Sequence, residues 1–99
     1  MKNLSIGTDI EKVSRFANLA KDSAFLKKIY SKKELEYCFN NANPAQHLAG
    51  RFTAKEAVIK ALAGLSKNPV SRKNIEIIND KSGIPRVYLK KTLTLKRKI

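Results

Sequence analysis

One long helix, predicted from about Ala45 to Ala63, constrains this chain more than any other feature. The segment is rich in strong helix formers and has no interior proline, and Gly50 is its weakest position. Gly64 follows it as a helix stop, and Pro69 prevents the helix from continuing. We expect this helix to carry part of the core and part of the functional surface.

The predicted helix has two different faces. Val58, Ile59 and Leu62 fall in one sector, which we expect to face the core. Glu56 and Lys60 are four residues apart, so their side chains leave an adjacent sector together. Such a pair is either a surface ion pair, worth only ~0.3–0.5 kcal/mol, or the charged part of a binding site. Spacing alone favours the surface ion pair.

Shorter elements are predicted on both sides of the long helix. Ser31 followed by Glu34 is the capping-box arrangement that begins a helix. A turn-rich loop at 79–83 joins two apolar segments, as in a β-hairpin. The predicted elements are a strand at 4–10, helices near 10–20, 25–29 and 32–39, and hairpin strands at 75–78 and 87–89. This order predicts an α+β domain, with several helices packed on a small, mainly antiparallel sheet.

Composition limits the class of protein. The chain has 99 residues, which suits one domain near the lower end of sizes that bury an adequate core, and 42% of the residues are hydrophobic. Charges at Lys2, Asp9 and Lys12 leave no room for a signal-peptide core, and no apolar run approaches the ~20 residues of a membrane helix. Cys38 is the single cysteine, so we expect a buried, inert thiol. These features predict a cytoplasmic protein.

The net charge of +13 is the one bulk property that points to partners. A basic surface attracts nucleic acid, anionic lipid, acidic proteins or polyphosphate ligands, and charge alone does not choose among them. One hypothesis is a small nucleic-acid-binding module, whose affinity would fall steeply with salt. The sequence gives it little support, since it contains no recognised nucleic-acid motif and no basic strand interleaved with aromatic residues.

Asp9 and Glu56 together suggest a metal site. Asp9 ends the predicted N-terminal strand, and Glu56 lies on the long helix beside Lys60. Magnesium usually takes one or two protein carboxylates and completes its shell with phosphate oxygens and water. A strand-end carboxylate that faces a carboxylate and an ammonium on a helix could hold both the ion and a phosphate. The alternative is that Asp9 is a turn residue and Glu56 pairs with Lys60 at the surface.

These residues belong to two motifs whose order and separation resemble one known family. The matching segments are Gly7–Ile10, Arg15, Arg51–Ala57, Lys60 with Ala61, Ile75–Asp80 and Gly83–Pro85. The likeness covers roughly residues 4 to 89, and Arg51–Ala57 is its most specific part. On these residues the chain resembles the holo-acyl-carrier-protein synthases, the small bacterial phosphopantetheinyl transferases.

The resemblance implies a reaction. Members of the family transfer the 4′-phosphopantetheine arm of coenzyme A to a serine of apo acyl carrier protein, in fatty acid biosynthesis, and release adenosine 3′,5′-bisphosphate. By resemblance, Asp9 and Glu56 would hold Mg²⁺ against the pyrophosphate, and Glu56 would help to remove the serine proton. Lys60 would neutralise charge on the departing bisphosphate. Positioning and charge neutralisation do most of the work in such a transfer.

The resemblance also implies contacts outside the metal site. Arg51 and Lys55 are candidates for the other coenzyme phosphates, although each could instead be a solvated helix charge. Arg15 matches a position that contacts the carrier protein, which is acidic and would be drawn to a basic surface. Members work as homotrimers with active sites between subunits. We therefore expect a homotrimer that binds coenzyme A and carrier protein, and neither nucleic acid nor membrane.

The C-terminal end departs from the family pattern. Members continue past the hairpin into a strand that carries Ser-x-Ser-His, and nothing in this sequence matches it. The sequence is therefore divided into a transferase domain, residues 1–89, and a basic C-terminal tail, residues 90–99. A sheet without its last strand would expose an unpaired edge. A homologue that binds coenzyme A but has lost catalysis is a further alternative.

Overall fold

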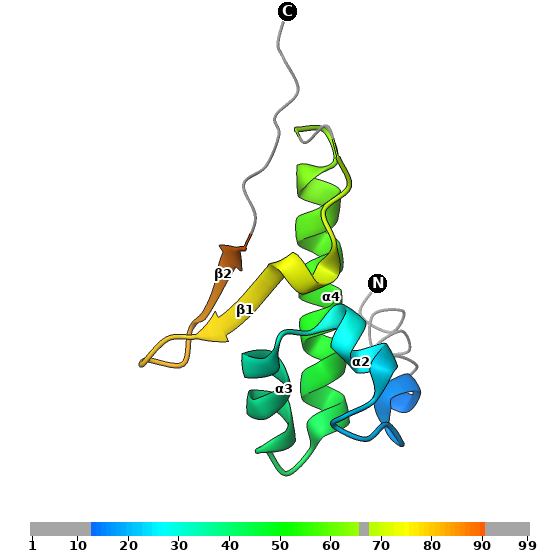
Figure 1. The fold of residues 1–99 in the computed structure, drawn as a ribbon. Helices are drawn as coiled ribbons and strands as arrows, with labels where there is room; N and C mark the ends of the chain where they lie inside the picture. The colour runs from blue at the N-terminus through cyan, green and yellow to red at the C-terminus, as the bar shows by residue number, and fades with distance from the viewer. Residues whose placement is uncertain (1–12, 66–67, 91–99) are drawn as a thin grey trace, which may run out of the picture.

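The computed structural model describes residues 13–65 and 68–90. A helical turn at 13–16 comes first. It is followed by α2 (Ala24–Ile29), α3 (Lys32–Phe39), α4 (Pro44–Leu62), the 3₁₀ helix η1 (Arg72–Asn74), β1 (Ile75–Asn79) and β2 (Pro85–Leu89). In Figure 1, α2 and α3 lie against the lower half of α4, and the hairpin extends to one side of the helices. The predicted α+β class is confirmed.

Helix α3 begins at the predicted capping box. Ser31 Oγ accepts a hydrogen bond from the Glu34 N–H at 3.2 Å, and Glu34 Oε1 accepts one from the Ser31 N–H at 2.9 Å. These two bonds satisfy N–H groups that a helix start leaves without a partner. Pro44 then lies in the first turn of α4, where its missing N–H costs nothing.

The core lies between the helices and against the first half of α4. Its buried members are Phe16, Leu26, Ile29, Tyr30, Leu35, Cys38, Leu48 and Ala49. The prediction that Val58, Ile59 and Leu62 face the core is wrong, because these side chains are only half-buried. The buried residues of α4 are Leu48, Ala49, Arg51 and Lys55. Two of them contact α3 and the end of α2, because the Leu48 carbonyl accepts a hydrogen bond from Tyr30 and the Lys55 ammonium binds Ile29 and Glu34.

β1 and β2 form the predicted antiparallel hairpin, with Ile75 opposite Leu89 and Asn79 opposite Pro85. The first three residues of β1 are buried, whereas every residue of β2 is exposed. The difference arises because β1 lies next to α3 and α4, while β2 contacts β1. The sheet of the described residues therefore has one covered strand and one open strand.

A side chain closes the hairpin loop. Asp80 Oδ1 accepts hydrogen bonds from the N–H groups of Ser82 and Ile84, at 2.9 and 3.0 Å. Gly83 has a φ of +87°, a backbone conformation that glycine adopts without steric cost. The loop is therefore built from the turn residues that the sequence offers there.

The first predicted helix ends earlier than expected. Helical structure in the described residues ends at Phe16, and Ala17 and Asn18 form a turn. The N–H groups of Ala17 and Leu19 bond the carbonyls three residues earlier, at 3.2 and 3.4 Å, a 3₁₀-type pattern that ends a helix. The predicted strand at 4–10 and the start of this helix lie outside the described residues.

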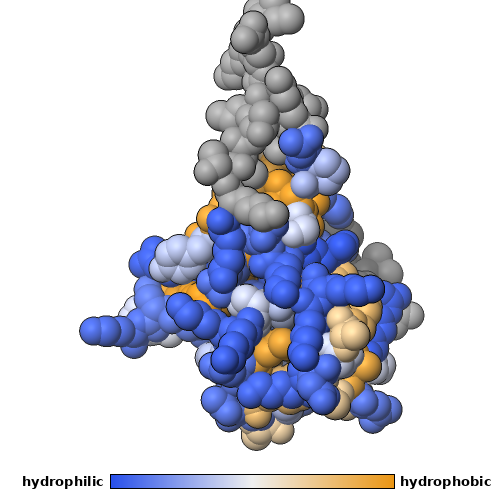
Figure 2. Space-filling model, in the orientation of Figure 1, coloured by the Kyte–Doolittle hydropathy of each residue, from blue (hydrophilic) through white to orange (hydrophobic). Residues whose placement is uncertain are grey.

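The face of the molecule seen in Figure 2 is largely hydrophilic, with smaller hydrophobic areas between the polar side chains. Such a surface agrees with the high content of lysine and arginine. In the ranges 13–65 and 68–90, no helix has both the length and the apolar character needed to span a bilayer.

Candidate active site

Helix α4 carries four of the predicted site residues and places them in different environments. Arg51 and Lys55 are buried, Glu56 is half-buried, and Lys60 is exposed. Successive helix residues point about 100° apart, so the side chain of Glu56 leaves the helix in a different direction from the buried Lys55. The predicted carrier-protein contact, Arg15, is exposed on the helical turn that precedes α2.

The carboxylate of Glu56 suits a hard metal ion, whereas its predicted partner is not described. Asp9 lies outside the described residues, so the pairing of Asp9 with Glu56 stays a prediction. No cluster of three His, Cys, Asp or Glu side chains is found within the described part of the chain. This does not conflict with magnesium, which often takes only one or two protein carboxylates. Glu56 can supply one of them from a rigid helix.

The guanidinium of Arg51 is held between two elements. It lies 4.4 Å from the centroid of the Tyr37 ring, and its Nη2 donates a hydrogen bond to Asn79 Oδ1 at 3.1 Å. Asn79 Nδ2 in turn donates to the Tyr37 hydroxyl at 3.1 Å. Arg51 Nε is buried and finds no hydrogen-bond partner among the described residues. A buried N–H without an acceptor is costly, and this one has almost no exposed area, so no ligand reaches it in this structure.

A cavity of about 600 Å³ adjoins Arg51, between α3, α4, β1 and the hairpin loop. Tyr37 and Asn79 line it as well, so the stacked arginine forms part of its wall. The charged residues around it are Lys33, Arg51 and Lys81 against Glu36 and Asp80. Asp80 is already paired with Arg86, at 3.0 Å. The cavity is therefore suited to an anion that carries several oxygen atoms.

Lys55 is turned inward, and its three N–H groups are used within the protein. Nζ donates to Glu34 Oε1 at 2.6 Å, and to the carbonyls of Ile29 and Arg72 at 2.9 Å each. Its side chain has no exposed area. Burial lowers the pKa of Lys55, and the hydrogen bond to Glu34 acts in the opposite direction. Neither a phosphate ligand nor a solvated helix charge fits this geometry, so both interpretations of Lys55 need correction.

Glu34 is the residue that sequence reasoning placed only in a cap. Besides Ser31 and Lys55, it binds β1, because its Oε2 accepts a hydrogen bond from the Ile77 N–H at 3.0 Å. The capping box could be recognised because it is local. The ion pair with Lys55 spans 21 residues of sequence and has no local signal.

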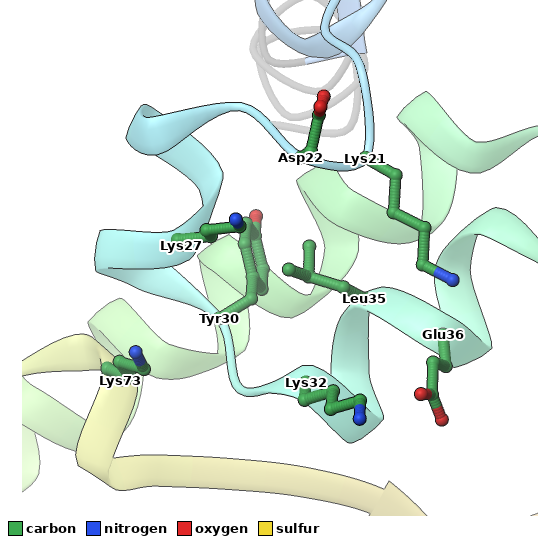
Figure 3. Close-up of a pocket in the computed structure, with 8 residues that line it drawn as sticks. All are labelled: Lys21, Asp22, Lys27, Tyr30, Lys32, Leu35, Glu36 and Lys73. Atoms are coloured by element: carbon green, nitrogen blue, oxygen red, sulfur yellow. The ribbon is translucent and has the colours of Figure 1, made fainter.

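A second cavity, of about 520 Å³, lies between α2, α3 and η1 (Figure 3). Buried Tyr30 and Leu35 line it together with exposed lysines, among them Lys27 and Lys73. The Tyr30 hydroxyl donates to the Leu48 carbonyl at 2.6 Å, and burial raises its pKa, so the phenol stays neutral. None of the predicted site residues lines this cavity.

Sequence similarity then decides the family. Residues 5–98 match the family model described as the 4′-phosphopantetheinyl transferase superfamily. The chain belongs to this superfamily. Both predicted motifs, with Asp9 in the first and Glu56 in the second, lie inside the matched segment.

Curated members of this superfamily are similar along most of the chain. A holo-[acyl-carrier-protein] synthase of Protochlamydia amoebophila is 45% identical over 93 residues, which is 92% of this chain and 76% of the relative. A protein of the same name from Geotalea daltonii is 40% identical, over 84% of this chain and 68% of the relative. One from Chlamydia caviae is 44% identical, over 90% and 74%. No solved structure matches the chain.

In this phosphopantetheinyl transferase, the described site residues fall into two groups. Arg51 faces a cavity with a charged rim, together with Tyr37 and Asn79. Lys55 and Glu34 form a buried ion pair, and neither side chain lines this cavity. Glu56 and Lys60 project from other directions of the same helix.

Proposed function

We propose that this chain is a holo-[acyl-carrier-protein] synthase, which transfers 4′-phosphopantetheine from coenzyme A to a serine of apo acyl carrier protein in cytoplasmic fatty acid biosynthesis. The superfamily match and the names of the similar proteins support the reaction class. One structural observation carries the proposal further. Arg51 lines a cavity together with Lys33 and Lys81, and stands on the same helix as Glu56.

The reaction is a substitution at phosphorus. The serine oxygen of the carrier protein forms a bond to the phosphorus on the pantetheine side of the pyrophosphate. The bond from that phosphorus to the bridging oxygen breaks, and adenosine 3′,5′-bisphosphate leaves. The serine proton passes to the carboxylate of Glu56, and the Lys60 ammonium balances the negative charge that develops on the leaving group.

Arg51 holds the coenzyme before the transfer. Its planar guanidinium suits a phosphate oxygen, since Tyr37 and Asn79 already restrict its motion at the wall of the cavity. Lys33 and Lys81 add positive charge at the same cavity. Little conformational entropy is then lost when the phosphate binds.

The metal chemistry depends on two carboxylates. Glu56 and Asp9 would hold Mg²⁺, which when bound neutralises charge on the pyrophosphate. The role of Glu56 is to offer oxygen from a rigid helix and to accept the serine proton. Asp9 belongs to the matched family segment and would be the second carboxylate.

The partner is an acidic carrier protein. Arg15 is exposed at the end of the helical turn that precedes α2, and the net charge of +13 favours the approach of an acidic protein. We further propose a homotrimer, in which a neighbouring subunit supplies part of the coenzyme site. The open strand β2 supports this assembly.

The decisive experiment incubates the protein with Mg²⁺, coenzyme A and apo carrier protein, and follows the mass of the carrier. We expect the carrier to gain one phosphopantetheine group, and the gain to stop when the metal is chelated. Glu56→Ala and Asp9→Ala should each abolish it in folded protein. The exposed Lys32→Ala variant is the matched control and should keep it. If coenzyme A binds in a calorimeter but the carrier gains no mass at high enzyme concentration, the chain has lost catalysis.

A further inference from the structure

The ion pair between Glu34 and Lys55 takes no part in the proposed chemistry, yet both side chains have zero exposed area. Removing two charges from water is expensive, and a well-packed apolar pair of similar volume is often as stable or more stable. Stability alone therefore gives a weak reason for this pair. Buried ion pairs are better attested as devices that select one packing register over its neighbours.

The contacts of Lys55 fix α4 from three directions. Its ammonium binds Glu34 on α3, the carbonyl of Ile29 at the end of α2, and the carbonyl of Arg72 in η1. A rotation or a shift of α4 would break all three hydrogen bonds at once. Beyond Lys55 the apolar side chains of α4 are only half-buried, at Val58, Ile59 and Leu62.

Glu34 is itself held in place, so it can act as a fixed point. Its two oxygens accept hydrogen bonds from the N–H groups of Ser31 and Ile77, at 2.9 and 3.0 Å, in addition to Lys55. The carboxylate therefore joins the start of α3 to β1 and to α4. The Lys55 ammonium and the Glu34 carboxylate therefore connect α2, α3, α4, β1 and η1.

Glu56 is the next residue after Lys55. Because successive residues of a helix point in directions fixed relative to each other, the direction of Lys55 determines that of Glu56. We propose that the Glu34–Lys55 pair is a positioning device, which sets the rotational register of α4 and thereby aims Glu56 at the reacting groups. The catalytic consequence rests on the proposed function, whereas the effect on the register of α4 does not.

The first test measures the register directly. The double variant Glu34→Gln/Lys55→Met removes both charges at nearly constant volume. Ala54 is half-buried and Ala57 is exposed, so Ala54→Cys and Ala57→Cys, each added to the parent and to the double variant, report how α4 faces solvent. Peptide mass spectrometry measures alkylation at each position, so that any alkylation of the buried Cys38 is counted separately.

In the parent, the cysteine at 57 should react faster than the cysteine at 54. In the double variant we expect the ratio of the two rates to fall several-fold, since α4 can then rotate. An unchanged ratio in folded protein would overturn the proposal. This measurement needs no enzymatic activity, so it decides the register even if the proposed function fails.

The second test separates positioning from coenzyme binding. We expect kcat of the double variant to fall at least about tenfold, with the KM for coenzyme A unchanged, because a small displacement of a reacting group costs rate and not ground-state binding. Lys32→Met, an exposed lysine on the same helix as Glu34, should keep both parameters. An increase in KM with unchanged kcat would make Lys55 a coenzyme ligand and refute the proposal.

A milder variant covers the case in which the double variant does not fold. Glu34→Asp alone keeps the charge opposite Lys55 but shortens the side chain by one methylene, so the carboxylate cannot hold all of its partners at once. The rate ratio and kcat should then fall in the same direction by a smaller factor. If neither changes in this folded variant, the pair does not set the register.

Discussion

Arg51 and Lys55 lie one turn apart on α4, and their surroundings give them opposite uses. All three N–H groups of Lys55 donate hydrogen bonds to protein oxygens. Arg51 lines a cavity, where Tyr37 and Asn79 hold its guanidinium in place. Residue type alone did not distinguish them, since each is a cation on the same predicted helix. Arg51 is therefore the residue at which coenzyme binding can be tested.

Arg51→Lys should weaken coenzyme A binding about tenfold, the cost of one charge-assisted hydrogen bond, and should leave kcat at saturating coenzyme nearly unchanged. Lysine keeps the charge but loses the planar group that stacks on Tyr37. Calorimetry measures the affinity. Arg72→Lys is the control, because Arg72 also lies over a ring, that of Phe52 at 5.0 Å, but lines neither cavity. Equal losses in both variants would contradict a specific role for Arg51.

Cys38 should be almost unreactive in the folded protein. Burial raises the pKa of its thiol to about 11, so at pH 8 only about one molecule in a thousand carries the reactive thiolate. Iodoacetamide should therefore label it at the rate of protein opening, and quickly in urea. Rapid labelling of native protein at pH 8, as fast as a free thiol peptide, would show that the site is open.

At the scale of the element, two glycines should respond to alanine with opposite signs. An added Cβ meets no atom within 4 Å at Gly83 or at Gly50. Gly83 has a positive φ, so Gly83→Ala should destabilise the protein by about 1 kcal/mol. Gly50 lies inside α4, so Gly50→Ala should stabilise it by about 0.5–1 kcal/mol. Urea unfolding measures both, and a stabilising Gly83→Ala would contradict the hairpin loop.

The free energy of unfolding should depend on pH, because Ser31 at the start of α3 contacts the carboxylate of Glu76. Burial opposes ionisation of Glu76, but the Ser31 hydroxyl and the Lys90 ammonium outweigh it and lower the pKa of Glu76. A lowered pKa gives stability that is present at neutral pH and is lost as the pH falls from about 5 to 3.

Ser31→Ala should therefore cost about 1–2 kcal/mol at pH 7, as expected for a lost N-cap, and less at pH 3. Ser31 is the cap of α3 and also donates to Glu76 Oε2 at 2.5 Å, so its loss removes both contributions. Urea unfolding at the two pH values measures the difference. Glu76→Gln should lose only the pH-dependent part, and equal losses for Ser31→Ala at both pH values would disprove the link.

Features that depend on neighbouring residues could be predicted from the sequence, and features that depend on contacts between distant residues could not. The capping box at Ser31 and the hairpin around Gly83 were predicted because each depends on a few adjacent residues. The core face of α4 was predicted wrongly, because it depends on where α2 and α3 pack along the helix. The burial of Lys55 was missed for the same reason, since its partners Glu34, Ile29 and Arg72 are far away in sequence.

At the scale of the whole molecule, the hairpin is the part that needs further cover. A hairpin of two strands is marginally stable in water, and β2 exposes Val87, Tyr88 and Leu89 by 50%, 53% and 42%. Apolar side chains on an open strand are typical of a surface that another chain covers. The homotrimer proposed for this superfamily member gives that cover, and β2 is where its assembly can be tested.

Val87→Lys should shift the protein from trimer to monomer, because it places an unpaired charge in the proposed interface. Light scattering during gel filtration at micromolar concentration measures the mass of both proteins. Phe25→Lys is the matched control: Phe25 is also apolar and 53% exposed, but it lies on α2 and should leave the trimer intact. A monomeric parent protein would exclude the trimer. A trimeric Val87→Lys variant would place the interface away from β2, and the strand would then need a different partner.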